Sequence, residues 1–235
     1  MKEPVVVEHE SVQVVRDDLY RGGTKARFLP VLFESVDEVV YAGPQEGGAQ
    51  TALAHVAAQL GKRATLFVAK RKKQHPRVKA ARELGAWVVE VYPGYLNQVK
   101  ARAREYCQAH GAGLAPFGVD LPEALDVVSR AALSTGLEPD EVWCAGGSGV
   151  LARSLARAWP ETRLNVVEVG RSLDSVDVGG ATVHKCGLRF GQECKTKPPF
   201  PSDPHYDAKA WEVCQRERGS GLVVFWNVTG PACQD

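Results

Sequence analysis

The chain has 235 residues and a formal net charge of +1, with 44% hydrophobic and 24% charged residues. This length is enough for one large α/β domain or for two smaller lobes with buried cores. No apolar run approaches the roughly 20 residues that a membrane-spanning helix needs, which excludes an integral membrane protein. The start, Met-Lys-Glu, lacks a signal-peptide pattern, so we expect a cytoplasmic protein.

Short apolar runs alternate with helical patterns along the chain. In the first half, strands are predicted at 37–43, 64–69 and 86–92, and helices at 47–61, 75–85 and 96–110. In the second half, helices are predicted at 121–133 and 150–159, and strands at 141–147, 164–170 and 222–228. Several strands are almost continuously apolar, which is typical of a parallel sheet covered by helices on both faces. The sequence therefore predicts an α/β fold whose sheet is large or split between two lobes.

The cysteines give no sign of disulfides or of a metal site. All six, at positions 107, 144, 186, 194, 214 and 233, lack a CxxC partner. A chain of this size does not depend on disulfides, so we expect reduced thiols. His184, Cys186, Cys194 and His205 could be drawn as a zinc site, but their spacing matches no compact finger or ribbon. We therefore predict no bound metal.

A glycine-rich turn follows the predicted strand at 141–147. The residues Gly146, Gly147, Ser148 and Gly149 lead directly into the predicted helix. Glycines allow backbone N–H groups to approach an anion closely, and a helix N-terminus favours negative charge. The turn lacks the GxGxxG and GK[ST] spacings, so a cofactor monophosphate is a better candidate ligand than a dinucleotide or a nucleoside triphosphate. The alternative is a tight strand-to-helix turn without a ligand.

Lys25 stands in an unusual setting, directly after two glycines and a threonine, in the first turn of a predicted amphipathic helix. A partly desolvated amine near Arg21 and Arg27 loses basicity and can form a Schiff base with an aldehyde. A solvated helix lysine is the commoner alternative. Together with a phosphate-binding turn, however, such a lysine suggests pyridoxal 5'-phosphate (PLP).

The segment RDDLYRGGTKARFL, residues 16–29, resembles the segment around the Schiff-base lysine in the aminocyclopropane-carboxylate (ACC) deaminase and D-cysteine desulfhydrase family. These enzymes have fold type II, the tryptophan-synthase-β-like fold of PLP enzymes. The order of the remaining motifs agrees, from the glycine-rich helix start at 47–61 to the terminal Val-Thr-Gly at 228–230. The resemblance spans most of the chain, which is shorter than typical members.

The resemblance implies two lobes with open, mostly parallel twisted sheets. Residues 1–43 and 113–235 would form the large PLP-binding lobe and residues 44–112 the small one. Lys25 would form the Schiff base and later carry a proton, while Gly146, Gly147, Ser148 and Gly149 would bind the phosphate. Thr229 would hydrogen-bond the pyridine nitrogen of PLP. A neutral hydroxyl at this position makes the cofactor a weaker electron sink than a carboxylate partner would. Such enzymes are commonly homodimers.

The sequence departs from the family at the expected substrate contacts. Gly47 and Gly48 replace a Ser-Asn pair, and Val228 replaces a tyrosine. We expect Gly47 and Gly48 to line the substrate site, with compensation from Gln50, Thr51 or Tyr206. These departures weaken the case for ring opening and for desulfhydration. They favour decarboxylation, which needs the substrate carboxylate held out of the cofactor plane and a proton donor such as Lys25.

A basic run, KRKKQHPRVK at 70–79, carries six Lys/Arg and no acid. It follows a predicted strand of the parallel sheet, so it begins at the carboxyl end, where α/β proteins bind ligands. The residues that could contact nucleic-acid phosphates are Lys70, Arg71, Lys72, Lys73 and Arg77. A solvated loop is the alternative, and the run contains no interleaved aromatic residues for base stacking.

The chain is also similar to small PLP proteins of bacterial viruses with hypermodified thymidine. The similarity lies in its short length, the segment PFPSDPHYDAKAW at 199–211 and the ending FWNVTG at 225–230. It implies an amino-acid adduct on a DNA pyrimidine, decarboxylated in the host cytoplasm to an aminoalkyl group. Three alternatives remain open: a free-amino-acid deaminase or desulfhydrase, a non-catalytic PLP binder, and a nucleotide-binding protein that forms no Schiff base.

Overall fold

The computed structural model describes residues 2–170 and 172–231. Its chain divides into two compact units, each described here by itself. Unit 1 combines the described residues up to Arg27 with Asp120–Pro231, and unit 2 comprises Phe28–Val119. Among the described residues, no helix has both the length and the apolar character needed to cross a membrane.

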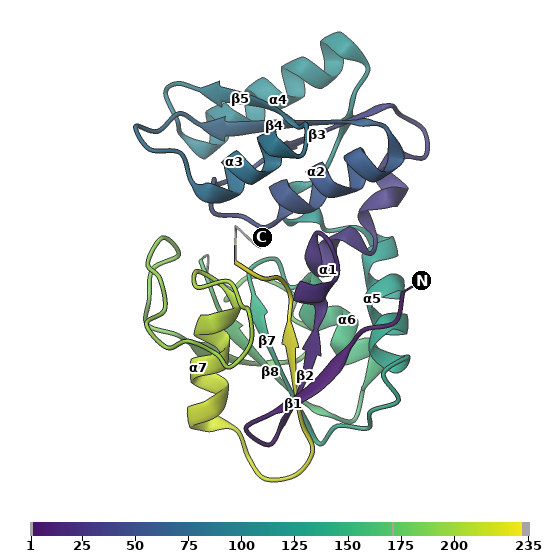
Figure 1. The fold of residues 1–235 in the computed structure, drawn as a ribbon, viewed down its shortest axis with the longest axis vertical. Coiled ribbons are helices and arrows are strands. Elements are labelled where there is room, and N and C mark those ends of the chain that lie inside the picture. The colour runs from purple at the N-terminus through teal and green to yellow at the C-terminus, as the bar shows by residue number, and fades with distance from the viewer. Residues whose placement is uncertain (1, 171, 232–235) are drawn as a thin grey trace. The chain divides into compact units, whose positions relative to one another are not determined.

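Unit 1 is built around a six-stranded sheet (Figure 1) with the order β1-β2-β10-β7-β8-β9. The strands are β1 (Val6–His9), β2 (Val12–Arg16), β7 (Glu141–Gly146), β8 (Arg163–Glu168), β9 (Thr182–Lys185) and β10 (Val223–Asn227). Neighbouring strands run parallel except for the β1–β2 hairpin. Because β2, β10, β7 and β8 are parallel neighbours, the segments that follow them leave from one edge of the sheet.

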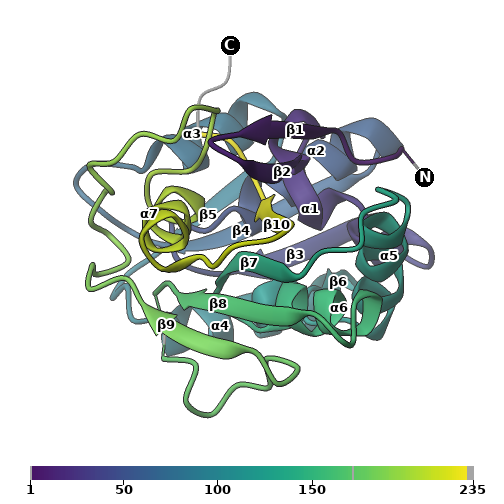
Figure 2. The same ribbon diagram turned by 90° about the horizontal axis from the view of Figure 1, so that it is seen from below.

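Helices cover both faces of this sheet. Figure 2 shows α7 on one face, and α5 and α6 on the other. Their bounds are Asp207–Glu217 for α7, Pro122–Leu133 for α5 and Val150–Ala158 for α6, while α1 (Gly23–Ala26) is a single turn preceded by a 3-10 turn at Asp17–Leu19. Under α7 lies a core that includes Trp143, Trp211 and Phe225, each at most 1% exposed. Burying large aromatic side chains of this kind is the main stabilising contribution to such a core.

Unit 2 contains a four-stranded parallel sheet with the order β5-β4-β3-β6. The strands are β3 (Glu38–Ala42), β4 (Arg63–Ala69), β5 (Trp87–Val91) and β6 (Gly113–Leu114); the helices are α2 (Ala49–Leu60), α3 (Pro76–Glu83) and α4 (Leu96–His110). Two 3-10 turns, Leu29–Phe33 and Phe117–Val119, flank them. In Figure 1, α2 and α3 lie on one face of the sheet and α4 on the other.

The predicted α/β fold with mostly parallel sheets is confirmed, and every predicted strand and helix is present. Three details differ. The helix around Lys25 is one turn long instead of an extended amphipathic helix. Strand β5 is an edge strand, so Trp87 is 56% exposed although its strand was expected to be covered on both faces. The β1–β2 hairpin, β9 and α7 lie in segments for which no element was predicted.

The two units are divided after Arg27 and Val119, whereas the sequence placed the boundaries after residues 43 and 112. The difference has a structural reason. Strand β3 pairs with β4 over Glu38–Ala42 and with β6 over Val39–Val40, so it belongs to the sheet of unit 2. Strand partners are set by tertiary pairing, and an apolar run does not reveal which sheet it will join.

Candidate active site

The segments that carry the predicted cofactor residues leave adjacent strands of unit 1. Strand β10 lies between β2 and β7, with Asn227 opposite Arg16 and Trp226 opposite Cys144. The segment with Lys25 follows β2, Val-Thr-Gly follows β10, and the glycine-rich turn follows β7. Ligands of open α/β sheets bind at the carboxyl ends of the strands. The sheet therefore gathers these three segments at the edge where a ligand is expected.

The turn that presents Lys25 is fixed by the buried carboxylate of Asp17. Thr24 Oγ1 donates to Asp17 Oδ2 at 2.8 Å, and Arg27 makes a two-nitrogen contact with the same carboxylate, with Nη2 2.5 Å from Oδ1 and Nε 3.0 Å from Oδ2. Trp226 Nε1 in turn donates to Thr24 Oγ1 at 2.9 Å, which ties the turn to β10. Buried charged hydrogen bonds of this kind are among the stronger ones in proteins. These hydrogen bonds therefore hold the turn that carries Lys25 in one conformation.

A second buried pair fixes the start of the same segment. Arg16 Nε and Nη2 donate to Asp18 at 2.8 and 2.7 Å, and Asn227 Nδ2 donates to Asp18 Oδ1 at 2.7 Å. Asn227 also donates to the carbonyl of Pro201 at 2.9 Å. Four charged residues of the segment thus fix the shape of the loop, namely Arg16, Asp17, Asp18 and Arg27.

The two glycines before Lys25 are required by the backbone. Gly22 and Gly23 have φ angles of 87° and 69°, in the left-handed region that favours glycine. A Cβ on Gly23 would lie 2.4 Å from the carbonyl oxygen of Val228. That carbonyl accepts a hydrogen bond from Thr24 N at 3.0 Å. The glycines therefore allow the Lys25 turn to touch the Val-Thr-Gly segment directly.

The glycine-rich turn between β7 and α6 is also closely packed. Gly149 has φ +79° and caps α6, and a Cβ there would lie 2.2 Å from the carbonyl oxygen of Asp177. A Cβ on Gly146 would lie 2.3 Å from Val166 Cγ1. The first turn of α6 carries no acidic residue, so its dipole is available to an anion. Gly146, Gly147, Ser148 and Gly149 thus have the geometry expected of a phosphate-binding turn.

Asp207, at the start of α7, is a site residue that the sequence analysis missed. Its side chain is fully buried, and Oδ2 accepts from Thr229 N at 3.2 Å. The other oxygen, Oδ1, has no hydrogen-bond partner among the described residues. Burial raises the pKa of Asp207 well above its usual range, and nearby Asp203 adds to this, while the backbone N–H groups of Val228 and Thr229 and, less strongly, Lys25 act in the opposite direction. The site therefore contains a buried carboxyl group with one unsatisfied oxygen.

Asp207 is only weakly marked in the sequence as a functional residue. An acid in the first turn of a helix usually stabilises the helix dipole from a solvated position, and the predicted elements included no helix at 207–217. Its place beside Thr229 depends on the packing of α7 against the end of β10. Asp203 N donates to Thr229 O at 3.2 Å, which fixes that packing.

Two other predicted residues lie in the same region of unit 1. Thr229 is adjacent to Gly23, since a Cβ on Gly23 would be 3.1 Å from Thr229 Cβ. Tyr206 donates to the carbonyl of Ala145 at 3.3 Å, and its hydroxyl lies 3.5 Å from the position of a Cβ on Gly147. Burial raises the pKa of Tyr206, so its hydroxyl stays protonated at neutral pH. Tyr206 thus lies against the glycine-rich turn.

The remaining predicted substrate residues belong to unit 2, where they follow β3. Gly48 is the N-cap of α2, and no side chain caps this helix start. Gln50 is fully buried; its Nε2 donates to the carbonyl of Pro44, and its Oε1 has no partner among the described residues. Thr51 Oγ1 donates to Gly48 O at 3.2 Å. An uncapped helix start next to Gly47 and Gly48 suits an anionic group such as a carboxylate.

The basic run also lies in unit 2, and the structure divides it into two parts. Lys70, Arg71, Lys72 and Lys73 are exposed in the loop after β4. Arg77 is only 2% exposed, and its Nη1 lies 3.4 Å from Thr51 Oγ1, so its side chain packs inside unit 2 and is not presented at the surface with the four others. The first turn of α3 turns Arg77 towards α2. A charge run in sequence does not show which of its members the helix buries.

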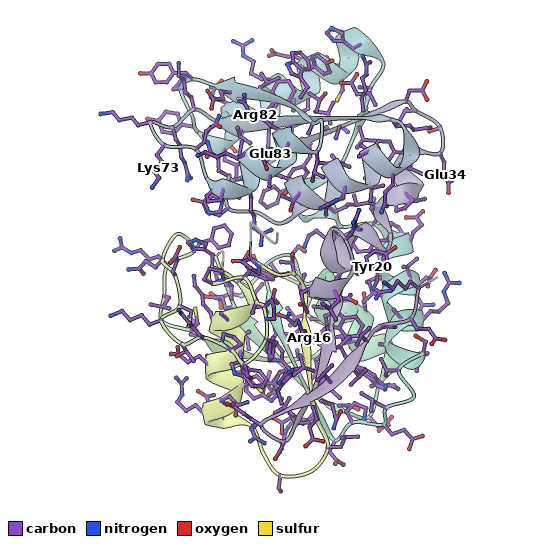
Figure 3. All side chains as sticks on the ribbon, viewed as in Figure 1. Arg16, Tyr20, Glu34, Lys73, Arg82 and Glu83 are labelled. Atoms are coloured by element: carbon purple, nitrogen blue, oxygen red, sulfur yellow. The ribbon has the colours of Figure 1, made fainter. Side chains whose placement is uncertain are left out.

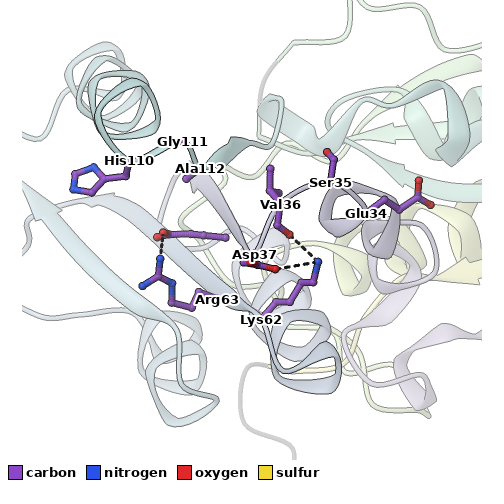
Figure 4. A pocket seen from close by; sticks show the side chains of 10 residues that line it. Glu34, Ser35, Val36, Asp37, Lys62, Arg63, His110, Gly111 and Ala112 are labelled. Atoms are coloured by element: carbon purple, nitrogen blue, oxygen red, sulfur yellow. Dashed lines mark hydrogen bonds and ion pairs between the residues drawn. The ribbon is translucent and has the colours of Figure 1, made fainter.

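A surface pocket of unit 2 is distinct from all of these residues (Figure 4). It lies at the amino ends of β3 and β4 and is lined by residues such as Asp37, Lys62 and His110. Lys62 Nζ donates to the carbonyls of Phe33 and Val36 and lies 3.5 Å from Asp37 Oδ1. The lysine therefore stabilises the turn before β3, and the pocket gives no reason to assign a ligand.

Comparison with known proteins identifies the fold. No protein-family model matches the sequence. An ACC deaminase homologue of known structure has a TM-score of 0.82 at 17% identity, covering 98% of this chain and 90% of that one. The apo diaminopropionate ammonia lyase of Escherichia coli has a TM-score of 0.65 at 16% identity, covering 93% and 77%. Threonine deaminase isoform 2 of Solanum lycopersicum has 0.66 at 15% identity, covering 95% and 75%. The chain has the fold of the fold type II PLP enzymes.

One curated protein is similar in sequence. It is the glycyl-dTMP PLP-dependent decarboxylase of Pseudomonas phage M6, which is 28% identical over 213 residues and covers 75% of this chain and 76% of that protein. The resemblance to the fold type II enzymes and to their small phage-encoded relatives is confirmed.

Proposed function

We propose that this protein is a PLP-dependent lyase that decarboxylates an amino-acid adduct on a thymidine or related pyrimidine of phage DNA, leaving an aminoalkyl group. The observation that carries the PLP assignment is the unsatisfied buried carboxyl oxygen of Asp207, close to Lys25 and the phosphate-binding turn in unit 1. The reaction and the substrate class are taken from the similarity to the phage decarboxylase.

The residues of unit 1 fit PLP at each of its polar groups. Lys25 would hold the aldehyde group, and the glycine-rich turn with the dipole of α6 would hold the phosphate. Asp207 would hold the ring nitrogen through Oδ1, the oxygen that lacks a partner. When bound, PLP accepts the electron pair left at the substrate Cα.

Assigning the ring nitrogen to Asp207 revises the role predicted for Thr229. Thr229 donates its backbone N–H to Asp207 and accepts from Asp203 N, so its backbone positions the acid. Since burial raises the pKa of Asp207, the carboxyl group keeps a proton that it can place on the ring nitrogen. A carboxyl partner makes the cofactor a stronger electron sink than the neutral hydroxyl expected from the sequence.

The reaction breaks the bond between Cα and the carboxylate, releases carbon dioxide and adds a proton at Cα. Lys25 is the proposed proton donor to this carbon. Gly47, Gly48, Gln50 and Thr51 of unit 2 remain the predicted contacts of a substrate carboxylate, because the uncapped N-terminus of α2 suits an anionic group. Tyr206, fixed against the phosphate-binding turn and protonated, would position the cofactor and exclude water from its phosphate side.

A free-amino-acid deaminase is the second candidate. It is favoured by the structural similarity to the ACC deaminase homologue, which covers 98% of this chain. The deaminase reaction is disfavoured by the residues at positions 47, 48 and 228, because Gly47, Gly48 and Val228 have no acidic or basic side chain. This enzyme would release ammonia from a free amino acid and would not need DNA.

The test begins with the visible absorption of the purified protein mixed with PLP. The wild type should show the band of PLP held by a lysine, and Lys25→Ala should lose it. The control variant Lys62→Ala, whose lysine belongs to the pocket of unit 2, should keep the band. Products are then measured by mass spectrometry on DNA that carries a glycyl-modified thymidine, alongside ammonia release from free amino acids. Loss of carbon dioxide from the DNA nucleoside supports the proposal, and ammonia release without it supports the deaminase.

A further inference from the structure

Two exposed loops of unit 2 lie side by side at the carboxyl edge of its sheet. The lysine loop, residues 70–75, follows β4, and the tyrosine loop, residues 92–95, follows β5. Lys70 N donates to Val91 O at 2.9 Å, and a Cβ on Gly94 would be 2.8 Å from Ala69 Cβ. The two loops are therefore packed against each other at their bases.

The lysine loop presents positive charge without neutralising acids. Lys70, Lys72 and Lys73 are exposed, and none of them forms an ion pair within residues 2–170 and 172–231. Figure 3 shows Lys73 at the outer edge of unit 2. Glu46 pairs with Arg71 at 2.5 Å, and Glu90 accepts a hydrogen bond from the neutral side chain of Gln74, so three unpaired lysines outweigh the one remaining acid. The loop thus attracts anions over a distance comparable to the Debye length.

The tyrosine loop presents aromatic rings to solvent. Tyr92 is 83% exposed and Tyr95 is 73% exposed, so neither ring contributes to the core. No charged residue lies between Val91 and Gln98. Exposed aromatic side chains beside a cationic surface are the recurrent features of proteins that bind single-stranded nucleic acid, where bases stack on the rings and phosphates follow the cations. The basic run itself contains no aromatic residues, and the rings come from the neighbouring loop.

Hydrogen bonds connect the lysine loop to the predicted substrate loop. Gln45, which is fully buried, accepts from His75 N at 2.9 Å through Oε1 and donates to Ala69 O at 2.7 Å through Nε2. The Glu46–Arg71 pair adds a second connection next to Gly47 and Gly48. A strand held on the lysine and tyrosine loops would therefore be positioned relative to the substrate loop within one rigid unit.

We propose that Lys70, Lys72, Lys73, Tyr92 and Tyr95 form a binding surface for single-stranded DNA, with phosphates on the lysines and unstacked bases on the tyrosines. This inference rests on the proposed function, because the DNA is the carrier of the modified pyrimidine. It adds that the enzyme holds the nucleotides on either side of its target unpaired. A base must leave the duplex before it can enter a pocket, so binding of the unpaired strand would favour this step.

The test measures fluorescence anisotropy of a labelled oligothymidylate of about 20 nucleotides, and of a duplex of the same length, over a range of salt concentrations. The triple variant Lys70→Gln, Lys72→Gln, Lys73→Gln should weaken binding. Since each phosphate contact on a single strand contributes about 0.7 to the slope of log K against log salt, the loss of three contacts should reduce the magnitude of that slope by about 2. The charge-matched control changes three exposed lysines of unit 1 to Gln, namely Lys185, Lys195 and Lys197, and should leave the slope unchanged.

Stacking is tested with Tyr92→Ser and Tyr95→Ser. Each should weaken binding of the single strand by about 5- to 150-fold, while Tyr92→Phe and Tyr95→Phe should retain it. Equal losses on the duplex and on the single strand would overturn the stacking role. Unchanged affinity in both the lysine and the tyrosine variants would overturn the surface as a whole.

The result is distinguishable from failure of the proposed function. The lysine and tyrosine variants of these two loops should keep the visible band of lysine-held PLP, because all of the changed residues belong to unit 2. A wild-type protein that binds the oligonucleotide but shows no PLP band would contradict the proposed function and leave the DNA surface standing. A protein with the band and with activity on a modified nucleoside, but with variants that bind DNA as the wild type does, would contradict this inference alone.

Discussion

The contact between the Lys25 turn and the end of β10 can be tested with one methyl group. Gly23→Ala places a Cβ 2.4 Å from the carbonyl oxygen of Val228, a distance at which the backbone must move. The same carbonyl accepts from Thr24 N at 3.0 Å. The substitution therefore separates the two segments that carry Lys25 and Thr229. Gly136→Ala is the matched control, because Gly136 is also in unit 1 with φ +68°, and a Cβ there meets no described atom within 4 Å.

The expected magnitudes follow from these contacts. A non-glycine residue in the left-handed region costs about 1–2 kcal/mol, and this applies to both variants. Gly23→Ala also weakens the Thr24–Val228 hydrogen bond, which is worth about 0.5–1.5 kcal/mol. The free energy of unfolding should thus fall by about 1.5–3.5 kcal/mol for Gly23→Ala and by about 1–2 kcal/mol for Gly136→Ala.

Urea unfolding measures the stability, followed by the fluorescence of Trp143 and Trp226, which are buried in unit 1. The absorption band of added PLP reports on the site. Gly23→Ala should lose the band even in buffer without urea, whereas Gly136→Ala should keep it. Equal losses of stability in the two variants, with the band intact in both, would refute the argument that this contact positions Lys25.

Two further predictions concern the buried acids. Asp17→Asn leaves the guanidinium of Arg27 buried without a counter-charge, so the free energy of unfolding measured in urea should fall by about 3–5 kcal/mol. The control Asp126→Asn removes an exposed ion pair and should change this free energy by less than about 1 kcal/mol. Similar losses in the two variants would contradict the role of the buried pair. Since the folded pKa of Asp207 is raised, the folded protein binds the extra proton, and stability without PLP should fall as pH rises from about 4 towards that raised pKa. Asp207→Asn should remove this fall and stabilise the protein at neutral pH without PLP, yet weaken decarboxylation; urea midpoints that follow pH in parallel for wild type and variant would show that Asp207 is not the titrating group.

Much of the fold was predictable because its elements are strongly patterned. The alternation of apolar strands with helices over 37–110 and 121–170 is local information, and it sufficed for an α/β fold with parallel sheets. The β1–β2 hairpin was not predicted, although its residues are rich in valine, and α7 begins inside a segment that reads as loop. Their formation depends on pairing with β10 and on packing over the core around Trp211.

The sequence by itself determined the chemistry that the site could hold. The two glycines before Lys25 and the Gly-Gly-Ser-Gly turn are visible in the chain, because strained backbone and close approach to an anion both require glycine. The sequence also located the basic run. It did not distinguish Arg77, which α3 buries, from the lysines that remain exposed.

The tertiary structure decided which of these residues meet. Strands β2, β10 and β7 are adjacent in the sheet although their residues are far apart in the chain, so the segments after them converge at one edge. Packing of α7 against that edge brings Asp207 to Thr229 and buries a carboxyl group whose second oxygen is left without a partner. The cost of desolvating such a group depends on what surrounds it in space, and neighbours in the sequence do not reveal it.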